Sequence, residues 1–121
     1  MRDYTVAKEF KVDQFTIILD WCYEDLPLSY VFETEEEIAV HNQRCCDYTD
    51  THFVARVRAM YDGVEMGSDT LGSCYAYDCS PEDSFNDGLD GYLEQMVDAA
   101  LDQARSEAVA MLDRLKEDFL N

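Results

Sequence analysis

Carboxylates recur at every fourth position near the C-terminus, at Asp90, Glu94, Asp98 and Asp102. In an α-helix four residues advance by roughly 6 Å along the axis, so this spacing would place a row of negative charges along one rod. Such a row resembles the phosphates of a nucleic-acid strand. We therefore expect a binding surface for basic groups, with these candidate residues: Asp83, Asp87, Asp90, Tyr92, Glu94, Asp98 and Asp102.

The simplest alternative is a solvated helix face, because charge runs usually face water. Like charges four residues apart also weaken a helix rather than support it. The distribution of basic residues argues for more than solvation, since no Lys or Arg lies between Arg58 and Arg105 or between Lys11 and Arg44. An ordinary soluble surface intersperses both signs. One face of the protein is therefore expected to be strongly negative.

The segment from Asp83 to Glu94 partly fits a calcium-binding loop of the EF-hand type. Asp87 and Gly88 stand where that loop has a ligand and its invariant glycine. Phe85, however, occupies a position that requires an oxygen ligand. We favour the alternative, a flexible acidic loop that leads into a helix.

The other candidates for metal or nucleophilic chemistry are five cysteines and two histidines, namely Cys22, Cys45, Cys46, Cys74, Cys79, His41 and His52. Structural zinc sites use closely spaced ligand pairs with a second such pair, and only Cys74 and Cys79 come near that spacing. We expect buried free thiols rather than zinc ligands or disulfides. Nothing around these residues resembles a nucleophile motif. The chain is therefore predicted to be no enzyme and to hold no metal or cofactor.

Composition indicates one acidic domain, residues 1–121, with 27 Asp and Glu against 9 Lys and Arg and a net charge of -18. A hydrophobic content of 47% argues against a disordered acidic tail. Direct nucleic-acid binding is excluded, because neutralising phosphates requires Lys and Arg, and a basic protein surface is favoured as the partner. The apolar run from Phe15 to Leu19 is too short to cross a membrane and no signal sequence precedes it, so we expect a cytoplasmic protein.

The element that must position the acidic residues is a C-terminal helix from Asp87 to Phe119. Its apolar residues recur at intervals of three and four, which is the period of an amphipathic helix. The stripe consists of Leu89, Leu93, Met96, Val97, Ala100, Leu101, Ala104, Ala108, Met111, Leu112, Leu115 and Phe119. We expect this stripe to be continuous and to face the core.

Alternating apolar residues predict strands before that helix. Phe15 to Trp21 alternates with β-branched and aromatic content and predicts a strand. Tyr4 to Val12 and Tyr30 to Phe32 predict shorter extended pieces. Thr34 with Glu37 resembles a capping box, which predicts a helix of two or three turns. The apolar residues that follow would fit a strand equally well.

A β-hairpin is the second clear feature of the sequence. Phe53 to Tyr61 alternates regularly, and Asp62-Gly63 supplies the pair that a type I′ turn needs. Gly67 and Gly72 on the returning strand suggest a bulge or a close approach of two backbones. The predicted fold is therefore α+β, with an antiparallel sheet of three to four strands covered by a long C-terminal amphipathic helix.

Three tyrosines, Tyr75, Tyr77 and Tyr92, surround the acidic segment. Tyrosine is enriched at protein interfaces, so a role in recognition is one interpretation. Packing at the rim of the core is the alternative, and we favour it slightly for the group while keeping Tyr92 among the candidate binding residues.

The stretch from Tyr61 to Tyr75 (YDGVEMGSDTLGSCY), followed by Asp87-Gly88 and a helix that contains Tyr92, resembles a loosely defined group of small acidic proteins of phages and prophages. The resemblance covers residues Phe53 to Leu112. It implies a viral or mobile-element origin, where small acidic proteins often inhibit host nucleic-acid-directed defences such as CRISPR effectors and restriction enzymes. The resemblance transfers no functional residue to this chain.

The function expected from these observations is that of an anti-CRISPR or anti-restriction type of inhibitor. It would mimic nucleic-acid charge and occupy a basic channel of a defence complex, in the host cytoplasm if a phage encodes it. Two alternatives stay open. One is a calcium- or zinc-binding regulatory module, and the other is a non-catalytic structural or assembly protein of a phage or mobile element. A homodimer also stays open.

Overall fold

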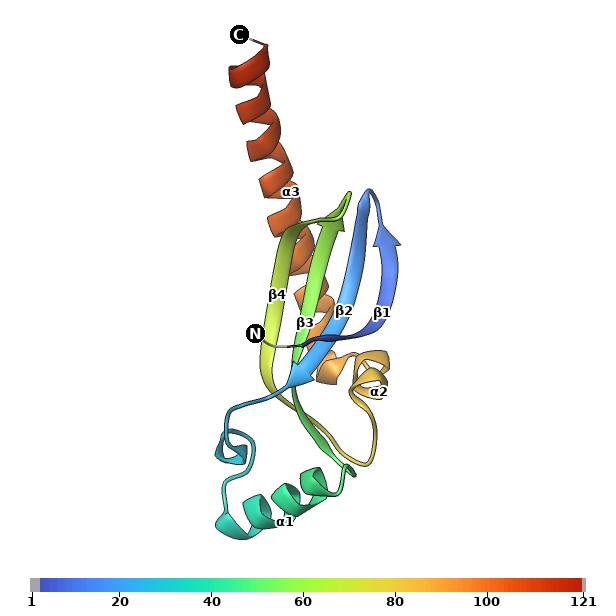
Figure 1. The fold of residues 1–121 in the computed structure, drawn as a ribbon, viewed down its shortest axis with the longest axis vertical. Helices are drawn as coiled ribbons and strands as arrows, with labels where there is room; N and C mark the ends of the chain where they lie inside the picture. Colours follow the sequence, from blue (N-terminus) through green and yellow to red (C-terminus); the bar gives the residue numbers. More distant parts are fainter. Residues whose placement is uncertain (1–2, 121) are drawn as a thin grey trace.

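A computed structural model describes residues 3–120 as a four-stranded antiparallel sheet with one long helix against it (Figure 1). The strands are β1 (Thr5–Val12), β2 (Phe15–Tyr23), β3 (Thr51–Tyr61) and β4 (Val64–Ala76), and they lie in the order β1-β2-β3-β4. The predicted α+β fold is confirmed, and so is the strand number at the upper end of the expected range.

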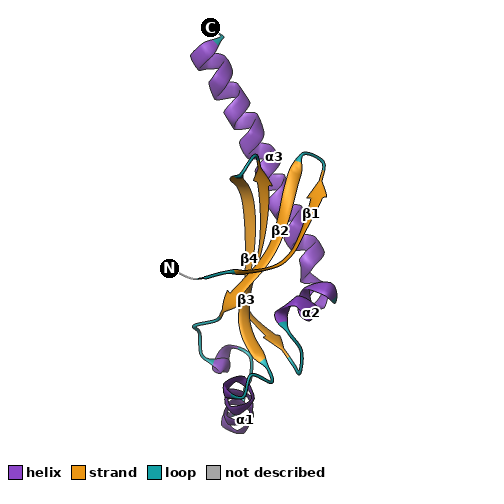
Figure 2. Ribbon diagram, turned by 45° about the vertical axis from the view of Figure 1, so that its right-hand side comes forward, coloured by secondary structure: helices purple, strands orange, loops and turns teal. Residues whose placement is uncertain are grey.

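The helical segments lie at three places around the sheet (Figures 1 and 2). Helix α3 crosses one face of the sheet and continues past the end where the β3–β4 turn lies, whereas α1 lies beyond the opposite end. Their bounds, with those of the short 3-10 turns, are η1 (Leu28–Tyr30), α1 (Glu35–Cys46), α2 (Pro81–Asn86), η2 (Leu89–Gly91) and α3 (Tyr92–Phe119).

The core lies between the sheet and the first half of α3. Period-two alternation turns Phe15, Ile17 and Leu19 of β2 toward the helix, and all three are buried. Strand β3 does the same with Phe53, Ala55, Val57 and Ala59, and α3 contributes Met96, Ala100, Leu101 and Ala104. The alternation read from the sequence therefore assigns the correct face to both central strands.

The closest contact of helix and sheet is at Gly67 of β4. A Cβ atom at this position would lie 2.1 Å from the carbonyl oxygen of Ala100 and 2.8 Å from the backbone nitrogen of Ala104. The ladder between β3 and β4 shifts register next to this glycine, between Ala59 and Met60. The close approach predicted at Gly67 is confirmed, because only a residue without a side chain allows α3 to lie on the β4 backbone.

The β3–β4 turn has the geometry that its sequence predicts. Asp62 has φ 49° and Gly63 has φ 78°, which are the left-handed values that a type I′ turn requires at both central positions.

The segment after β2 differs in part from expectation. No strand forms at Tyr30 to Phe32, because the chain makes the η1 turn and buries Leu28 and Phe32 instead. The helix predicted after Thr34 is confirmed, with the Thr34 hydroxyl accepting a hydrogen bond from the Glu37 backbone N–H at 3.1 Å. The strand alternative for this stretch is therefore wrong.

The predicted start of the long helix at Asp87 is wrong. Asp87 caps the C-terminus of α2, and the chain then reverses through left-handed residues before α3 begins at Tyr92. Gly88 and Gly91 have φ 82° and 90°, while Leu89 and Asp90 have φ 50° and 56°. Two glycines in this turn permit a conformation that a continuous helix excludes.

The expectation of one continuous core-facing stripe on α3 is also wrong. Ala104 is the last buried residue, because the helix runs past the end of the sheet and finds no further surface to cover (Figure 1). Leu112 and Leu115 are each 51% exposed and Phe119 is 76% exposed. The second half of α3 therefore carries an apolar face with no counterpart in the part of the chain that the structure describes.

Between residues 3 and 120, no helix combines the length and the apolar character that crossing a membrane requires.

Truncation of α3 should show that its two halves contribute differently to the stability of the fold. Residues 109–120 are all exposed, so we expect deletion of residues 109–121 to change the free energy of unfolding at low protein concentration by less than about 1 kcal/mol. Deleting residues 101–121 removes the buried Leu101 and Ala104 and should abolish cooperative urea unfolding. A shorter deletion that already abolishes cooperativity would show that the exposed half supports the fold.

The substitution Gly67→Ala should destabilise the protein by about 1–3 kcal/mol, because the added methyl meets helix backbone that cannot move aside. Gly72→Ala is the matched control on the same strand, since its Cβ would meet only a side-chain oxygen of Glu24, at 3.2 Å. Chemical denaturation of both variants tests this. Equal effects would contradict a contact specific to Gly67.

Candidate functional site

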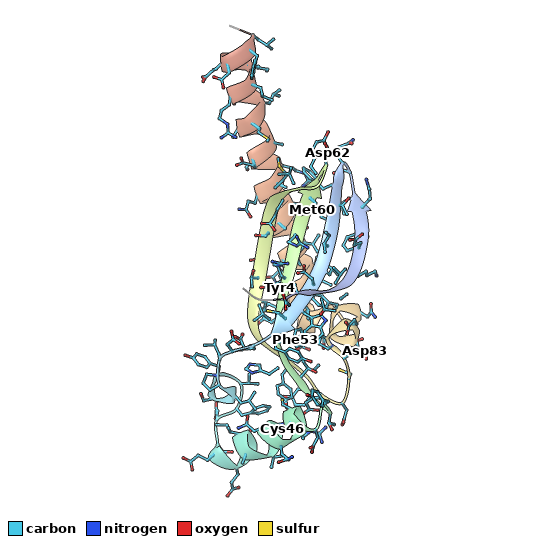
Figure 3. The ribbon with its side chains drawn as sticks, viewed as in Figure 1. Tyr4, Cys46, Phe53, Met60, Asp62 and Asp83 are labelled. Carbon is cyan, nitrogen blue, oxygen red and sulfur yellow. The ribbon has the colours of Figure 1, made fainter. Side chains whose placement is uncertain are left out.

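The predicted binding residues begin in α2, where Asp83 has a structural task. Its Oδ2 accepts a hydrogen bond from the Ser80 backbone N–H at 3.2 Å, while the Ser80 hydroxyl accepts one from the Asp83 N–H at 3.2 Å. This reciprocal pair is a capping box, and Pro81 occupies the first turn of the helix. Asp83 is exposed, but its carboxylate already stabilises the helix start (Figure 3).

Asp87, Asp90 and Tyr92 line one cavity of about 470 Å³. It lies between the end of β4 and the turn that precedes α3, with Leu71 and Leu89 among its apolar lining. All of its charged lining residues are carboxylates, so the cavity is negative with apolar walls. Three of the seven residues selected from the sequence therefore meet at one site.

The thiol of Cys74 reports on the electrostatics of this cavity, which it also lines. Burial, together with the smaller effect of the negative charges of Glu24 and Asp90, raises the pKa of Cys74 to about 11, against a backbone hydrogen bond at Ala55 that lowers it. The thiol therefore stays protonated at neutral pH and is a poor nucleophile. All five cysteines are free, as the sequence predicts, but the expectation that they are buried is wrong except for Cys22, since Cys45, Cys74 and Cys79 are half-buried and Cys46 is exposed.

The remaining carboxylates of the row, Glu94, Asp98 and Asp102, are exposed on α3. Within residues 3–120, only Asp102 of these three has a basic neighbour, Arg105, at 4.0 Å. Four residues turn an α-helix by roughly 400°, so each step moves the row about 40° around the axis. Asp90 stands outside the helix, which corrects the predicted ladder: a helical row of three follows a turn with two carboxylates.

Of the three tyrosines, Tyr75 is half-buried, whereas Tyr77 and Tyr92 are exposed. Tyr92 is 52% exposed beside the cavity. The Tyr75 hydroxyl instead donates to Asp50 Oδ2 at 2.7 Å, and Tyr77 packs against Tyr75 with ring centroids 4.7 Å apart. Tyr75 is therefore a packing residue, in agreement with the interpretation favoured for the group, whereas Tyr92 is available to a partner.

A cluster that the sequence did not reveal centres on Asp50. This carboxylate is buried and accepts hydrogen bonds from Arg44 Nε at 2.8 Å, from the Tyr75 hydroxyl and from the Asp78 backbone N–H at 2.9 Å. The Arg44 guanidinium and these donors hold the pKa of Asp50 far below its usual range. The one available signal was Arg44 itself, an isolated basic residue in a long acidic stretch.

His41 extends the same cluster toward the surface. Its ring stacks on Phe32 with centroids 4.0 Å apart, and its Nδ1 lies 3.2 Å from the Tyr75 hydroxyl and 3.4 Å from Asp50 Oδ2. The Nδ1 of His41, the Tyr75 hydroxyl and the Asp50 carboxylate thus contact one another. We interpret the group as the structural joint that fixes α1 to the end of the sheet.

A second buried carboxylate lies on the sheet face that α3 leaves uncovered. Asp20 is 0% exposed and binds Arg56 through two bonds of 2.8 and 2.7 Å and Arg58 NH2 at 3.0 Å. Tyr4, labelled over the sheet in Figure 3, covers the Arg56 guanidinium at 3.5 Å. Alternation along β2 turns Asp20 to the face opposite Leu19, but nothing in the sequence indicates that Asp20 is buried.

No group of three His, Cys, Asp or Glu side chains within the described residues is arranged to hold a metal ion. The segment from Asp83 to Glu94 forms a helix end, a reversal and a new helix rather than a calcium loop. The calcium and zinc alternatives therefore find no support in this geometry.

The buried Asp50 predicts a specific pH dependence. Because its pKa is lower in the folded state, its stabilisation is present above about pH 4 and is lost as the pH falls further. Asp50→Asn should lower the free energy of unfolding by about 3 kcal/mol at neutral pH, and the difference from the parent should shrink as the medium is acidified. Asp98→Asn, an exposed control, should change little. Urea unfolding across a pH series measures both, and a constant difference would contradict the assignment.

Comparison with known proteins adds no relative to this description: no family model matches the chain, and no curated protein or solved structure is significantly similar to it.

Proposed function

We propose that this protein is a non-catalytic inhibitor that binds a basic surface of another protein through an acidic surface of its own. We define the acidic surface by the residues Asp87, Asp90, Tyr92, Glu94, Asp98 and Asp102. The basic surface would be one on which the partner holds a nucleic-acid backbone, so that the inhibitor takes the place of phosphates.

The observation that carries the proposal is the internal neutralisation of the arginines. Arg44 is held by Asp50 and Asp78, and both Arg56 and Arg58 are held by Asp20. Among the described residues, the acidic surface meets a basic side chain only where Arg105 approaches Asp102, and Arg105 also binds Asp13 at 2.9 Å. Three of the nine basic residues of the chain are thus neutralised by Asp20, Asp50 and Asp78, and the acidic surface has Arg105 as its one basic neighbour among the described residues.

The cavity supports a particular way of binding. A long cationic side chain can lie with its methylene groups against Leu71 and Tyr92 and its charge near Asp87 and Asp90, which all line the cavity. Lysine and arginine from a phosphate-binding channel have this combination of apolar stem and charged end. The exposed row on α3 would then extend the contact along the partner.

The class of partner is a nucleic-acid-directed defence complex of a host cell, such as a CRISPR effector or a restriction enzyme. This choice follows from the resemblance of Tyr61 to Tyr75 and its flanking residues to small acidic phage proteins. Attraction between an acidic surface and a basic channel would make association fast and strongly dependent on salt.

A second candidate function is a structural or assembly protein of a phage or mobile element. The observation that favours it is the exposed apolar half of α3, since a large apolar surface usually marks an interaction site. In that case the acidic surface would serve solubility alone.

Charge reversal tests the proposal directly. Changing Asp90, Glu94, Asp98 and Asp102 to Lys should leave the fold intact, because all four are exposed. Binding to a partner recovered from host lysate at low salt should weaken by several kcal/mol, since like charges would then meet across the interface. Binding is measured as competition with DNA for the purified partner at low and high salt.

The control variant reverses four acidic residues elsewhere, Glu9, Glu36, Asp47 and Glu65, and so reaches the same net charge. It should bind much more tightly than the first variant. Equal loss in both variants would mean that only net charge matters, and unchanged binding in both would reject the acidic surface as an interface.

A further inference from the structure

The exposed apolar half of α3 has a spacing that matches a second copy of itself. Ala108, which is half-buried against the core, precedes the exposed Leu112, Leu115 and Phe119 at intervals of four, three and four residues, which is the spacing of a coiled-coil seam. This pattern reads the same in both directions. A two-fold interface requires such a self-complementary surface.

We propose that the protein forms a homodimer through an antiparallel pair of these helix halves. In this arrangement Leu112 lies opposite Leu115 of the second copy, and Ala108 lies opposite Phe119, so that each large residue meets an apolar neighbour. The present exposure of Leu112 and Leu115, each 51%, and of Phe119, 76%, is the surface that would be buried.

The charges beside the seam favour this orientation. Asp113 and Lys116 lie on one flank of the seam, and Arg114 and Asp118 lie on the other. In an antiparallel pair each flank faces the same flank of the other copy, and with Leu112 opposite Leu115 the level of Lys116 falls within two residues of Asp113 of the second copy. Opposite charges therefore meet on that flank.

The distribution of charge along the chain also favours a dimer through the second half of α3 and in the antiparallel orientation. Arg105, Arg114 and Lys116 nearly balance Glu107, Asp113, Glu117 and Asp118, so this part of a chain of net charge -18 is almost neutral. An antiparallel overlap of twelve residues keeps the two acidic bodies at opposite ends, roughly 18 Å further apart than side-by-side packing. That separation exceeds the Debye length of about 8 Å at physiological salt.

The proposed homodimer does not depend on the acidic surface. Its formation should respond to salt in the opposite direction to binding of a basic partner. Added salt screens the repulsion between two acidic bodies and should strengthen the dimer, whereas it should weaken binding to a basic partner. Sedimentation equilibrium of the full chain under reducing conditions, from about 1 µM to a few hundred µM, covers the affinities of small interfaces. We expect a monomer–dimer equilibrium that shifts toward dimer at high salt.

The variant Leu112→Glu with Leu115→Glu should weaken dimerisation by at least about a hundredfold. Its helix content and its melting temperature at low concentration should stay those of the parent, because both residues are exposed in the monomer. The control Ser106→Glu with Ala110→Glu adds the same two charges on the opposite side of the helix and should dimerise like the parent.

A charge exchange tests the orientation. Lys116→Glu alone places two carboxylates together and should weaken the dimer, and adding Asp113→Lys should restore it. A parallel dimer brings neither pair together and would show no restoration. Small-angle X-ray scattering provides an independent check, since an antiparallel dimer has two separated bodies and a maximum dimension well above that of the monomer.

Three results would overturn the proposal. The chain could stay monomeric at the highest concentration and salt, or the Glu variants at Leu112 and Leu115 could dimerise like the parent. The third result is a monomeric chain whose exposed helix half captures a different protein, because the occupant would then not be a second copy.

Discussion

The contact between α3 and the backbone of β4 at Gly67 sets the position of most other features. The carbonyl of Ala100 occupies the space that a side chain at Gly67 would need, so the helix lies directly on strand backbone. At this close distance α3 cannot slide or roll without a clash. This contact places the start of α3 beside the end of β4, where the cavity forms. It also determines how much of α3 extends beyond the sheet.

The placement of charge follows a second constraint, the cost of burying a carboxylate. Asp20 and Asp50 are both inside the molecule, and each is held by arginine. An unpaired buried carboxylate would cost several kcal/mol, so these two positions require Arg44, Arg56 and Arg58, three of the six arginines of the chain. The many remaining carboxylates must then stay on the surface, where water solvates them. An uneven surface charge is therefore a consequence of the core as much as of any partner.

Local patterns predicted the local structure well. Alternation defined β2 and β3, Asp62-Gly63 defined the hairpin turn, and the spacing of three and four defined α3. The reversal at Gly88 to Gly91 was missed because periodicity continues through it. The exposed half of α3 was missed for a different reason, since a periodic pattern shows which side of a helix is apolar but not whether a surface lies opposite.

The candidate site was predicted only in part for the same reasons. Asp87, Asp90 and Tyr92 were selected for their charge and position, but the cavity that they share depends on how α3 docks. The ion pairs of Asp20 and Asp50 join residues on different elements, and the sequence indicates such pairing only through isolated basic residues such as Arg44.

The order of the strands has a consequence for how the chain reaches this structure. Each strand pairs with its neighbours along the sequence, so β1 with β2 and β3 with β4 form hairpins with short closing turns. Only the pairing of β2 with β3 closes a longer loop, the one that contains α1. The entropy of loop closure grows slowly with length, so this single step adds little to the barrier. A topology dominated by such local pairings has a low contact order and is expected to fold rapidly, with α3 docking on hairpins that have already formed.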